Sequence, residues 1–265
     1  MGKKIRIDVL LTENNYFDSR EKAKRSIMAG KVLVNNQIVD KAGALVELDS
    51  EIRVKEKDRY VSRGGFKLEK AIAEFDLVLE NKICMDIGSS TGGFTDCMLQ
   101  NGASKVYSVD VGYGQLAWKL RIDEKVEVME RVNFRRLDTD TIKDKMDFFS
   151  VDVSFISLMH MFPNIKRLSK DNSEIVTLIK PQFEAGREKV GKHGVVRDKK
   201  VHMEVIRNVI NYAKENELFC KSVTFSPLKG AKGNIEYLAL FVTKDENIEI
   251  DPEKIVNFAL DELNN

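Results

Sequence analysis

The chain has 265 residues, of which 43% are hydrophobic and 32% charged, so it can bury one ordinary core and a small second one, and two domains are expected. No apolar run approaches the roughly 18 residues of a membrane span, and the first residues turn acidic and polar too soon for a secretory signal. The three cysteines lack C-x-x-C spacing and lie in apolar contexts, which excludes a disulfide scaffold and favours a cytoplasmic protein with buried thiols.

Charge is distributed unevenly along the chain. The formal net charge is only +1, but residues 1–70 hold 16 Lys and Arg against 11 Asp and Glu, a net +5, and the remainder is net −4. A basic front segment is suited to an anionic partner. On charge alone, a solvated lysine-rich surface explains the excess equally well.

Residues 1–59 predict a small helix-and-hairpin unit. Ser19 can cap a helix whose apolar positions share one face, and Gly30 ends that helix. The stretch "KVLVNNQIV", residues 31–39, predicts strand, turn and strand, and "SEIRVKEK", residues 50–57, predicts a further strand. Because this segment contains no histidine or cysteine and its acids are scattered, no catalytic site is expected in it.

From residue 60 onward, predicted strands and helices alternate. Helices are expected within residues 59–75, with Phe66 among the apolar positions, and within 198–217. Such alternation indicates a mainly parallel sheet with helices on both faces, and ligands of such sheets bind beyond the carboxyl ends of the strands. The predicted strands are 83–87, 105–110, 126–130, 147–152, 173–179, 219–225 and 236–243.

The first strand-to-helix crossing carries the glycine-rich stretch "DIGSSTGGF", residues 86–94. It is not a dinucleotide fingerprint, because Ser90 stands where the second glycine is needed, and no Gly-Lys-Ser/Thr follows as in a Walker A loop. The second predicted strand ends in Asp110, which in such a sheet can accept hydrogen bonds from the ribose of an adenosine ligand. The alternative is a tight turn with Asp110 as a helix cap.

The front segment resembles the S4-type RNA-binding domain in "RIDVLL", "SREKAKRSIMAGKVLVNNQIV" and "EIRVKE", over roughly residues 5–56. Asn36 replaces the usual hairpin glycine and still tolerates a left-handed turn. The resemblance implies binding of structured RNA through phosphate contacts. The implied RNA-binding residues are Arg6, Arg20, Lys24, Arg25 and Lys31.

The glycine turn resembles motif I of S-adenosylmethionine-dependent methyltransferases, and specifically of FtsJ-type RNA ribose methyltransferases. Together with "YVSRGGFKL", "VDVGYGQLAWKLR", "DVSFIS", "LIKPQFE", "HGVVRD" and "SPLKGAKGNIEY", it makes the chain similar to the TlyA family, which joins an S4-type domain to an FtsJ-type domain. The implied fold is α/β, with a small α+β domain over residues 1–59 and a Rossmann-like domain with a seven-stranded, mainly parallel sheet over 60–265. The implied cofactor is S-adenosylmethionine, held by Asp86, Gly88, Ser90, Gly92, Gly93, Phe94, Asp110 and, more weakly, Asn133.

FtsJ-type enzymes use a Lys-Asp-Lys-Glu set, which by resemblance corresponds to Lys67, Asp152, Lys180 and Glu236. Asp152 and Lys180 close two predicted strands that lie next to each other, where parallel sheets place catalytic groups. A lysine that closes an apolar strand is poorly solvated, so Lys180 could take the proton from a ribose 2′-hydroxyl, with the two carboxylates orienting the lysines. Taken singly, each lysine is more ordinarily a strand end or an exposed helix residue.

The resemblance implies a methyltransferase that modifies the ribose of cytidine in ribosomal RNA, in one or both ribosomal subunits. We expect a monomer without a metal site, because the three histidines lack metal-ligand spacing. Three alternatives remain open: an RNA-binding ribosome-assembly factor, a membrane-active haemolysin, as the family has been named, and a small-molecule methyltransferase.

Two further features of the sequence lie outside these motifs. The stretch at residues 185–200 holds three glycines and six Lys or Arg against two acids, and predicts a mobile basic loop that closes over RNA, or else a plain connection. Trp118, the single tryptophan, is expected to be packed rather than stacked on a base.

Overall fold

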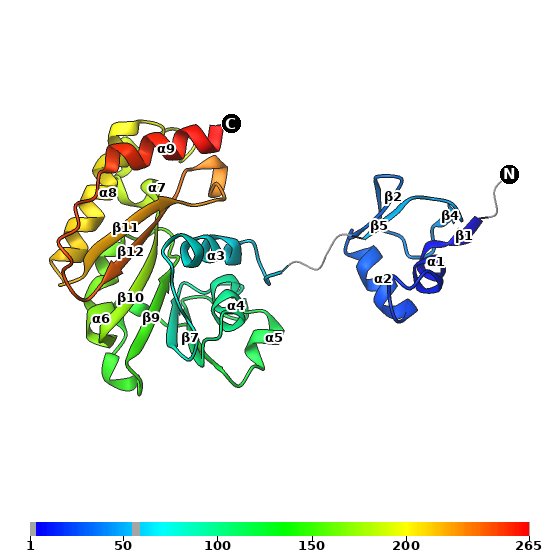
Figure 1. Ribbon diagram of the computed structural model, residues 1–265, viewed down its shortest axis with the longest axis horizontal. Coiled ribbons are helices and arrows are strands. Elements are labelled where there is room, and N and C mark those ends of the chain that lie inside the picture. The colour runs from blue at the N-terminus through cyan, green and yellow to red at the C-terminus, as the bar shows by residue number, and fades with distance from the viewer. Residues whose placement is uncertain (1–3, 55–58, 265) are drawn as a thin grey trace. The chain divides into compact units, whose positions relative to one another are not determined.

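The computed structural model describes residues 4–54 and 59–264 of a chain that divides into two compact units, Met1–Arg59 and Tyr60–Asn265 (Figure 1). Each unit has its own hydrophobic core.

The first unit packs two helices, α1 (Ile7–Glu13) and α2 (Arg20–Met28), against short strands. The Ser19 hydroxyl caps α2 by accepting a hydrogen bond from the backbone N–H of Lys22 at 3.3 Å. Asn35 and Asn36 form the hairpin turn with φ of 49° and 64°, the left-handed conformation that such a turn requires. The strands are β1 (Lys4–Arg6) paired with β4 (Leu45–Glu47), and β2 (Val32–Val34) paired with both β3 (Gln37–Val39) and β5 (Ile52–Val54).

These elements confirm the predicted helix, hairpin and later strand. The β1–β4 pair was not predicted, because strands of three residues give too short an alternation to be recognised. The predicted continuation of the last strand past residue 54 lies outside the described residues.

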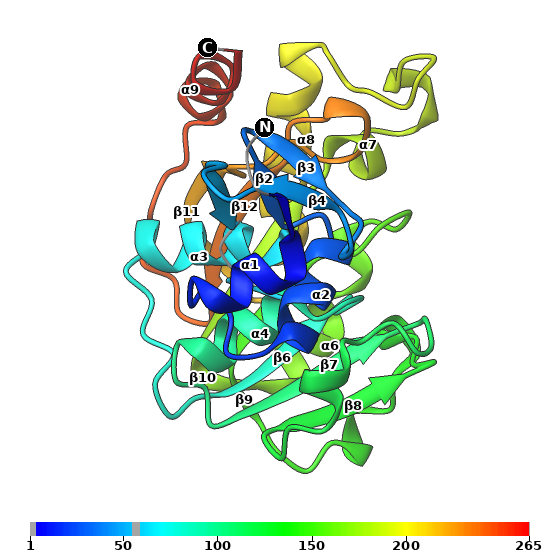
Figure 2. The same ribbon diagram turned by 90° about the vertical axis from the view of Figure 1, so that its right-hand side faces the viewer.

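The second unit is built on a seven-stranded sheet in the order β11-β12-β10-β9-β6-β7-β8, whose two edges can be followed in Figure 2. Neighbouring strands from β10 to β8 are parallel, and β12 is antiparallel to both of its neighbours. This confirms the predicted fold class, and every predicted strand is present. The strands are β6 (Ile83–Ile87), β7 (Lys105–Asp110), β8 (Val126–Glu130), β9 (Met146–Val151), β10 (Ser169–Ile179), β11 (Phe219–Phe225) and β12 (Tyr237–Val242).

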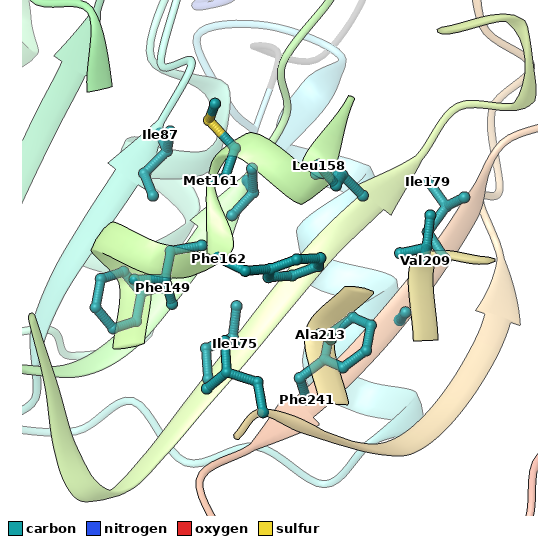
Figure 3. Packing of buried hydrophobic residues seen from close by; sticks show 14 of the residues in the cluster. Ile87, Phe149, Leu158, Met161, Phe162, Ile175, Ile179, Val209, Ala213 and Phe241 are labelled. Atoms are coloured by element: carbon teal, nitrogen blue, oxygen red, sulfur yellow. The ribbon is translucent and has the colours of Figure 1, made fainter. Parts of the chain in front are cut away.

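Helices cover both faces of this sheet. The buried side chains of α6, α8 and α9 share one hydrophobic cluster, part of which is shown in Figure 3, and those of α3 and α4 share another. The helices are α3 (Gly64–Glu74), α4 (Gly93–Gln100), α5 (Trp118–Arg121), α6 (Phe162–Leu168), α7 (Pro181–Glu184), α8 (Lys199–Lys214) and α9 (Pro252–Asn264). Short 3₁₀ turns occur at η1 (Phe134–Arg136), η2 (Thr139–Thr141), η3 (Leu158–His160), η4 (Arg187–Lys189) and η5 (Ala231–Gly233).

The expectation that Trp118 is packed is wrong, because its side chain is 71% exposed at the start of α5. Phe66 lies on the predicted helix, is 38% exposed and contacts Tyr60 edge-on, whereas Leu68 and Ala71 form the buried face of α3. The three cysteines are free thiols, as expected. Within the described residues no helix is long and apolar enough to cross a membrane.

Candidate active site

Two cavities adjoin at the carboxyl ends of the parallel strands. One has a volume of about 420 Å³ and lies between the glycine turn, the start of α3 and residues 228–231. The other, of about 510 Å³, lies between the ends of β6, β7 and β9 and the segment 132–135. Gly88, Ser90 and Asp152 line both cavities, so a single elongated ligand could reach from one into the other.

The glycine turn between β6 and α4 separates these cavities and leaves no room for side chains. Gly88 and Gly92 have φ of 85° and 90°, which side-chain-bearing residues rarely adopt. A Cβ on Gly88 would lie 2.4 Å from the backbone oxygen of Asp152, and a Cβ on Gly93 would lie 2.3 Å from Ser62 Oγ. Glycine is therefore required here so that the segments at Asp152 and Ser62 can approach the backbone of the turn closely.

The predicted cofactor residue Asp86 is fully buried at the end of β6. Its Oδ2 accepts hydrogen bonds from Thr95 N at 2.9 Å and Thr95 Oγ1 at 2.7 Å, and its Oδ1 accepts one from Ser150 Oγ at 3.0 Å. Burial raises the pKa of Asp86 to about 7, although these hydrogen bonds act in the opposite direction. In the described structure Asp86 therefore fixes the start of α4 and the strand beside it.

Replacing Asp86 with asparagine should change the pH dependence of stability. Between pH 4 and 7 native Asp86 holds a proton that the unfolded chain, with an ordinary pKa of 3.8, has lost, so the contribution of Asp86 to stability falls as pH rises to about 7 and then levels off. Asparagine does not titrate. The measurement is the difference in melting temperature between the wild-type protein and Asp86→Asn, without cofactor, because a bound ligand would itself add stability. This difference should decrease by several degrees from pH 4 to pH 7, because 1 kcal/mol corresponds to about 2–4 °C in a domain of this size. A difference independent of pH would contradict the prediction.

Asp110 and Asn133 lie together on the wall of the larger cavity. Asp110 closes β7, and its carboxylate accepts hydrogen bonds from Ser90 N at 2.7 Å and Gly112 N at 2.6 Å. Each carboxylate oxygen retains further acceptor capacity for a ligand hydroxyl. The alternative that Asp110 caps the following helix is wrong, because the N-cap residue of α5 is Ala117 and Asp110 instead joins its own turn to the glycine turn. Phe94 is buried behind the smaller cavity, beside Gly64.

The four predicted catalytic residues form two ion pairs. Lys180 Nζ lies 2.5 Å from Asp152 Oδ1, and Lys67 Nζ lies 2.6 Å from Glu236 Oε2. Lys180 and Glu236 are 8% and 3% exposed, whereas Asp152 and Lys67 line the smaller cavity. Gln182, which sequence reasoning missed, donates from Nε2 to Glu236 Oε1 at 3.2 Å. Each pair therefore contributes one member, Lys67 or Asp152, to the wall of the smaller cavity, with its buried partner behind it.

Phe155 is a second residue that sequence reasoning missed. Its side chain is 90% exposed and lines the larger cavity, its φ is 64°, and its ring centroid lies 4.8 Å from that of Phe183. The left-handed region is an outlier for a bulky side chain, and strain of this kind is concentrated at functional sites. Ser154, just before it, accepts a hydrogen bond from Lys180 Nζ at 3.0 Å, so this strained turn also contacts the predicted catalytic lysine.

In the first unit, two of the predicted RNA-binding arginines share one buried carboxylate. Asp8 is fully buried and accepts hydrogen bonds from Arg6 Nε at 3.0 Å and from an Arg20 guanidinium nitrogen at 2.8 Å. The hydrogen bond from Arg6 is the largest cause that lowers the pKa of Asp8 to about 2. Both guanidinium groups remain about half exposed, so Asp8 holds them side by side at the surface. No sequence signal distinguished Asp8 from the other acids of this segment.

The other three predicted RNA-binding residues differ in environment. Lys24 pairs with Glu21 at 2.8 Å on the exposed side of α2, which offsets part of its charge. Arg25 is exposed on the same helix, and Lys31 is partly buried just before β2. The surface is therefore basic but less so than a count of lysines and arginines suggests.

The chain matches two family models and is similar to several known proteins. Residues 60–242 match the FtsJ-like methyltransferase model, and residues 5–52 match the S4 domain model. The YqxC protein of Bacillus subtilis, whose name assigns it provisionally to the rRNA methyltransferases, is 54% identical over 89% of this chain and 85% of its own length. A Mycobacterium tuberculosis protein named 16S/23S rRNA (cytidine-2′-O)-methyltransferase TlyA is 38% identical over 93% of this chain and 92% of its own.

A solved structure from Streptococcus thermophilus, which bears a hemolysin name, is also similar. It has 44% sequence identity and a TM-score of 0.77, and covers 100% of this chain and 98% of its own. The similarity thus extends through both units and joins proteins that carry two different functional names.

Proposed function

The chain belongs to the FtsJ-like methyltransferase family, to the TlyA type that carries an S4 domain in front, and we propose on this premise that it methylates the ribose 2′-hydroxyl of cytidine in ribosomal RNA. S-adenosylmethionine is the cofactor of this family, and it supplies the electrophilic methyl group. Ribosomal RNA or a ribosomal subunit would be the partner, in the cytoplasm.

The residues present fit this cofactor. Gly88 and Gly93 line the smaller cavity with bare backbone, Gly88 lines the larger cavity as well, and the turn therefore offers backbone groups to a ligand that lies across both. Asp110 and Asn133 offer acceptors and donors in the larger cavity for an adenosine, and the smaller cavity would take the amino-acid portion. Asp86 would contribute by holding the turn in shape.

The observation that carries the proposal is the arrangement of the two lysine–carboxylate pairs at the edge of the smaller cavity. Lys180, in its neutral form, would accept the proton from the ribose 2′-hydroxyl, while Asp152 and Ser154 hold its amine in place. Lys67 and Glu236 would orient the ribose through their own paired charges. The protein's task is then to position the hydroxyl and remove one proton.

Phe155 would act as a platform for the base of the target nucleotide. Bases that enter an enzyme pocket leave the RNA stack, and an exposed aromatic ring can replace the lost stacking. The ring is 90% exposed and follows Asp152 by three residues, so a nucleotide with its base on this ring would lie close to the paired lysines.

The proposal is tested by transfer of labelled methyl from S-adenosylmethionine to purified small and large ribosomal subunits and to their naked RNAs. Nuclease digestion then locates the modified nucleotide. Label on the 2′-oxygen of a cytidine is the expected result, and label on a base would overturn the proposal. No label, with tight RNA binding retained, would favour the assembly-factor function instead, and leakage of liposomes without methyl transfer would favour a haemolysin.

A further inference from the structure

A third cavity, of about 390 Å³, lies beside the candidate active site and is basic. Its walls come from residues 195–197, from the segment 229–235 and from α8 and α9, and three of its lining residues are the cations Arg197, Lys229 and Lys232. Lys229 also lines the smaller cavity of the active site, together with Lys67 and Asp152. The third cavity therefore opens next to the place where the reacting ribose would lie.

The three cations have no counter-charge in the described part of the chain. None of their side chains forms an ion pair with a carboxylate there, and no acid lines the cavity. All three are exposed. Asp198, which follows Arg197, caps α8 by accepting a hydrogen bond from Lys200 N at 2.8 Å, and Glu236 is already occupied by Lys67 and Gln182. Three unpaired cations around one hollow favour an anionic ligand.

The backbone that carries these cations is fixed by one buried side chain. Asn234 is 2% exposed and joins the two loops: its Oδ1 accepts from Val196 N at 3.1 Å, and its Nδ2 donates to Gly194 O at 2.8 Å and to Ala231 O at 3.0 Å. Part of the basic stretch predicted to be mobile is thus held to the segment that leads into β12. Binding a ligand here requires little ordering of the backbone.

A second buried residue, His202, binds the backbone of Val196 through the carbonyl group that Asn234 does not contact. His202 on α8 donates from Nε2 to Val196 O at 3.0 Å, and its Nδ1 accepts from the Tyr237 hydroxyl at 2.8 Å. Burial lowers the pKa of His202, so the ring stays neutral and adds no charge. Both backbone groups of Val196 are therefore bound, which fixes the position of Arg197.

We propose that Arg197, Lys229 and Lys232 bind phosphodiester groups of the RNA strand next to the target nucleotide. The inference rests on the proposed function and adds a second RNA contact to that of the S4 domain. Lys and Arg side chains on a rigid surface neutralise phosphates without reading bases, and such contacts set the register of the strand. Here they would set which ribose reaches Lys180.

The test compares two charge-matched variants of the full chain. Arg197→Gln/Lys232→Gln removes two cations of the proposed site that do not line the catalytic cavity. Lys125→Gln/Lys143→Gln removes two exposed lysines that precede β8 and β9, at the amino ends of these parallel strands and so away from the cavities. Each protein is assayed for binding to labelled ribosomal RNA against salt concentration, for kcat and KM of methyl transfer, and for affinity for S-adenosylmethionine.

The first variant should raise KM for RNA about 3- to 10-fold with unchanged cofactor affinity. The negative slope of log affinity against log salt should become shallower by about 1.4, since each contact to a single strand contributes about −0.7. The control variant should match the wild type. Equal slopes and KM values for the two variants would overturn the inference while leaving the proposed function standing. If the wild type transfers no methyl but the first variant alone binds RNA more weakly, the phosphate site stands and the proposed function fails.

Discussion

Replacing Lys180 with methionine should lower the rate of methyl transfer by about 10²- to 10⁴-fold and leave the affinity for S-adenosylmethionine unchanged. This range is the usual contribution of a positioned general base. Methionine fills nearly the same volume as lysine, so the buried end of β10 keeps its packing, and only the amine beside Asp152 and Ser154 is lost. Single-turnover methyl transfer and equilibrium cofactor binding measure the two quantities separately.

The chain offers a matched control on the same two strands. Lys170 Nζ lies 2.8 Å from Asp147 Oδ1 at the start of β10 and β9, whereas Lys180 and Asp152 lie just beyond the ends of these strands. Lys170→Met therefore makes the same substitution in the same kind of pair, at the edge of the sheet away from the site, and should retain full activity. Activity retained in both variants would remove Lys180 from the base role.

Much of the catalytic unit could be predicted because its signals are local. Alternating strands and helices give the parallel sheet, and four predicted strands coincide with β6, β7, β8 and β11 to the residue. Glycines with positive φ mark the turn at Gly88 and Gly92, since other residues rarely adopt that conformation. A strand that ends in an acid or a lysine places that group at the edge where ligands bind.

What could not be predicted depends on contacts between distant parts of the chain. Asn234 joins its own loop to Gly194, 40 residues earlier in the chain, and Lys67 meets Glu236 across 169 residues. The role of Asp8 could not be predicted, because nothing in the sequence shows that Arg20 lies against it. The exposure of an aromatic side chain could not be predicted either, because a hydrophobic residue is expected to be buried. Trp118 and Phe155 are both exposed.

Replacing Phe155 with alanine should lower kcat/KM for RNA about 5- to 150-fold. Stacking of a base on an aromatic side chain contributes about 1–3 kcal/mol, and each 1.36 kcal/mol corresponds to a factor of ten. The ring is 90% exposed and contacts Phe183 at 4.8 Å between centroids, so its removal leaves no large void in the core. Phe155→Tyr keeps the aromatic surface and should retain most of the activity, whereas Phe155→Leu should behave like the alanine variant.

The same series decides between two roles for this ring, because Phe155 also lines the cavity that would hold the adenosine of the cofactor. If the ring supports the target base, Phe155→Ala changes kcat/KM for RNA and leaves cofactor affinity as it was. A fall in cofactor affinity by the same factor would make Phe155 a wall of the cofactor site. The exposure of the ring favours the first role, since a residue that only closed the cofactor site would not need to be 90% exposed. The strained φ of 64° holds the side chain in this exposed position.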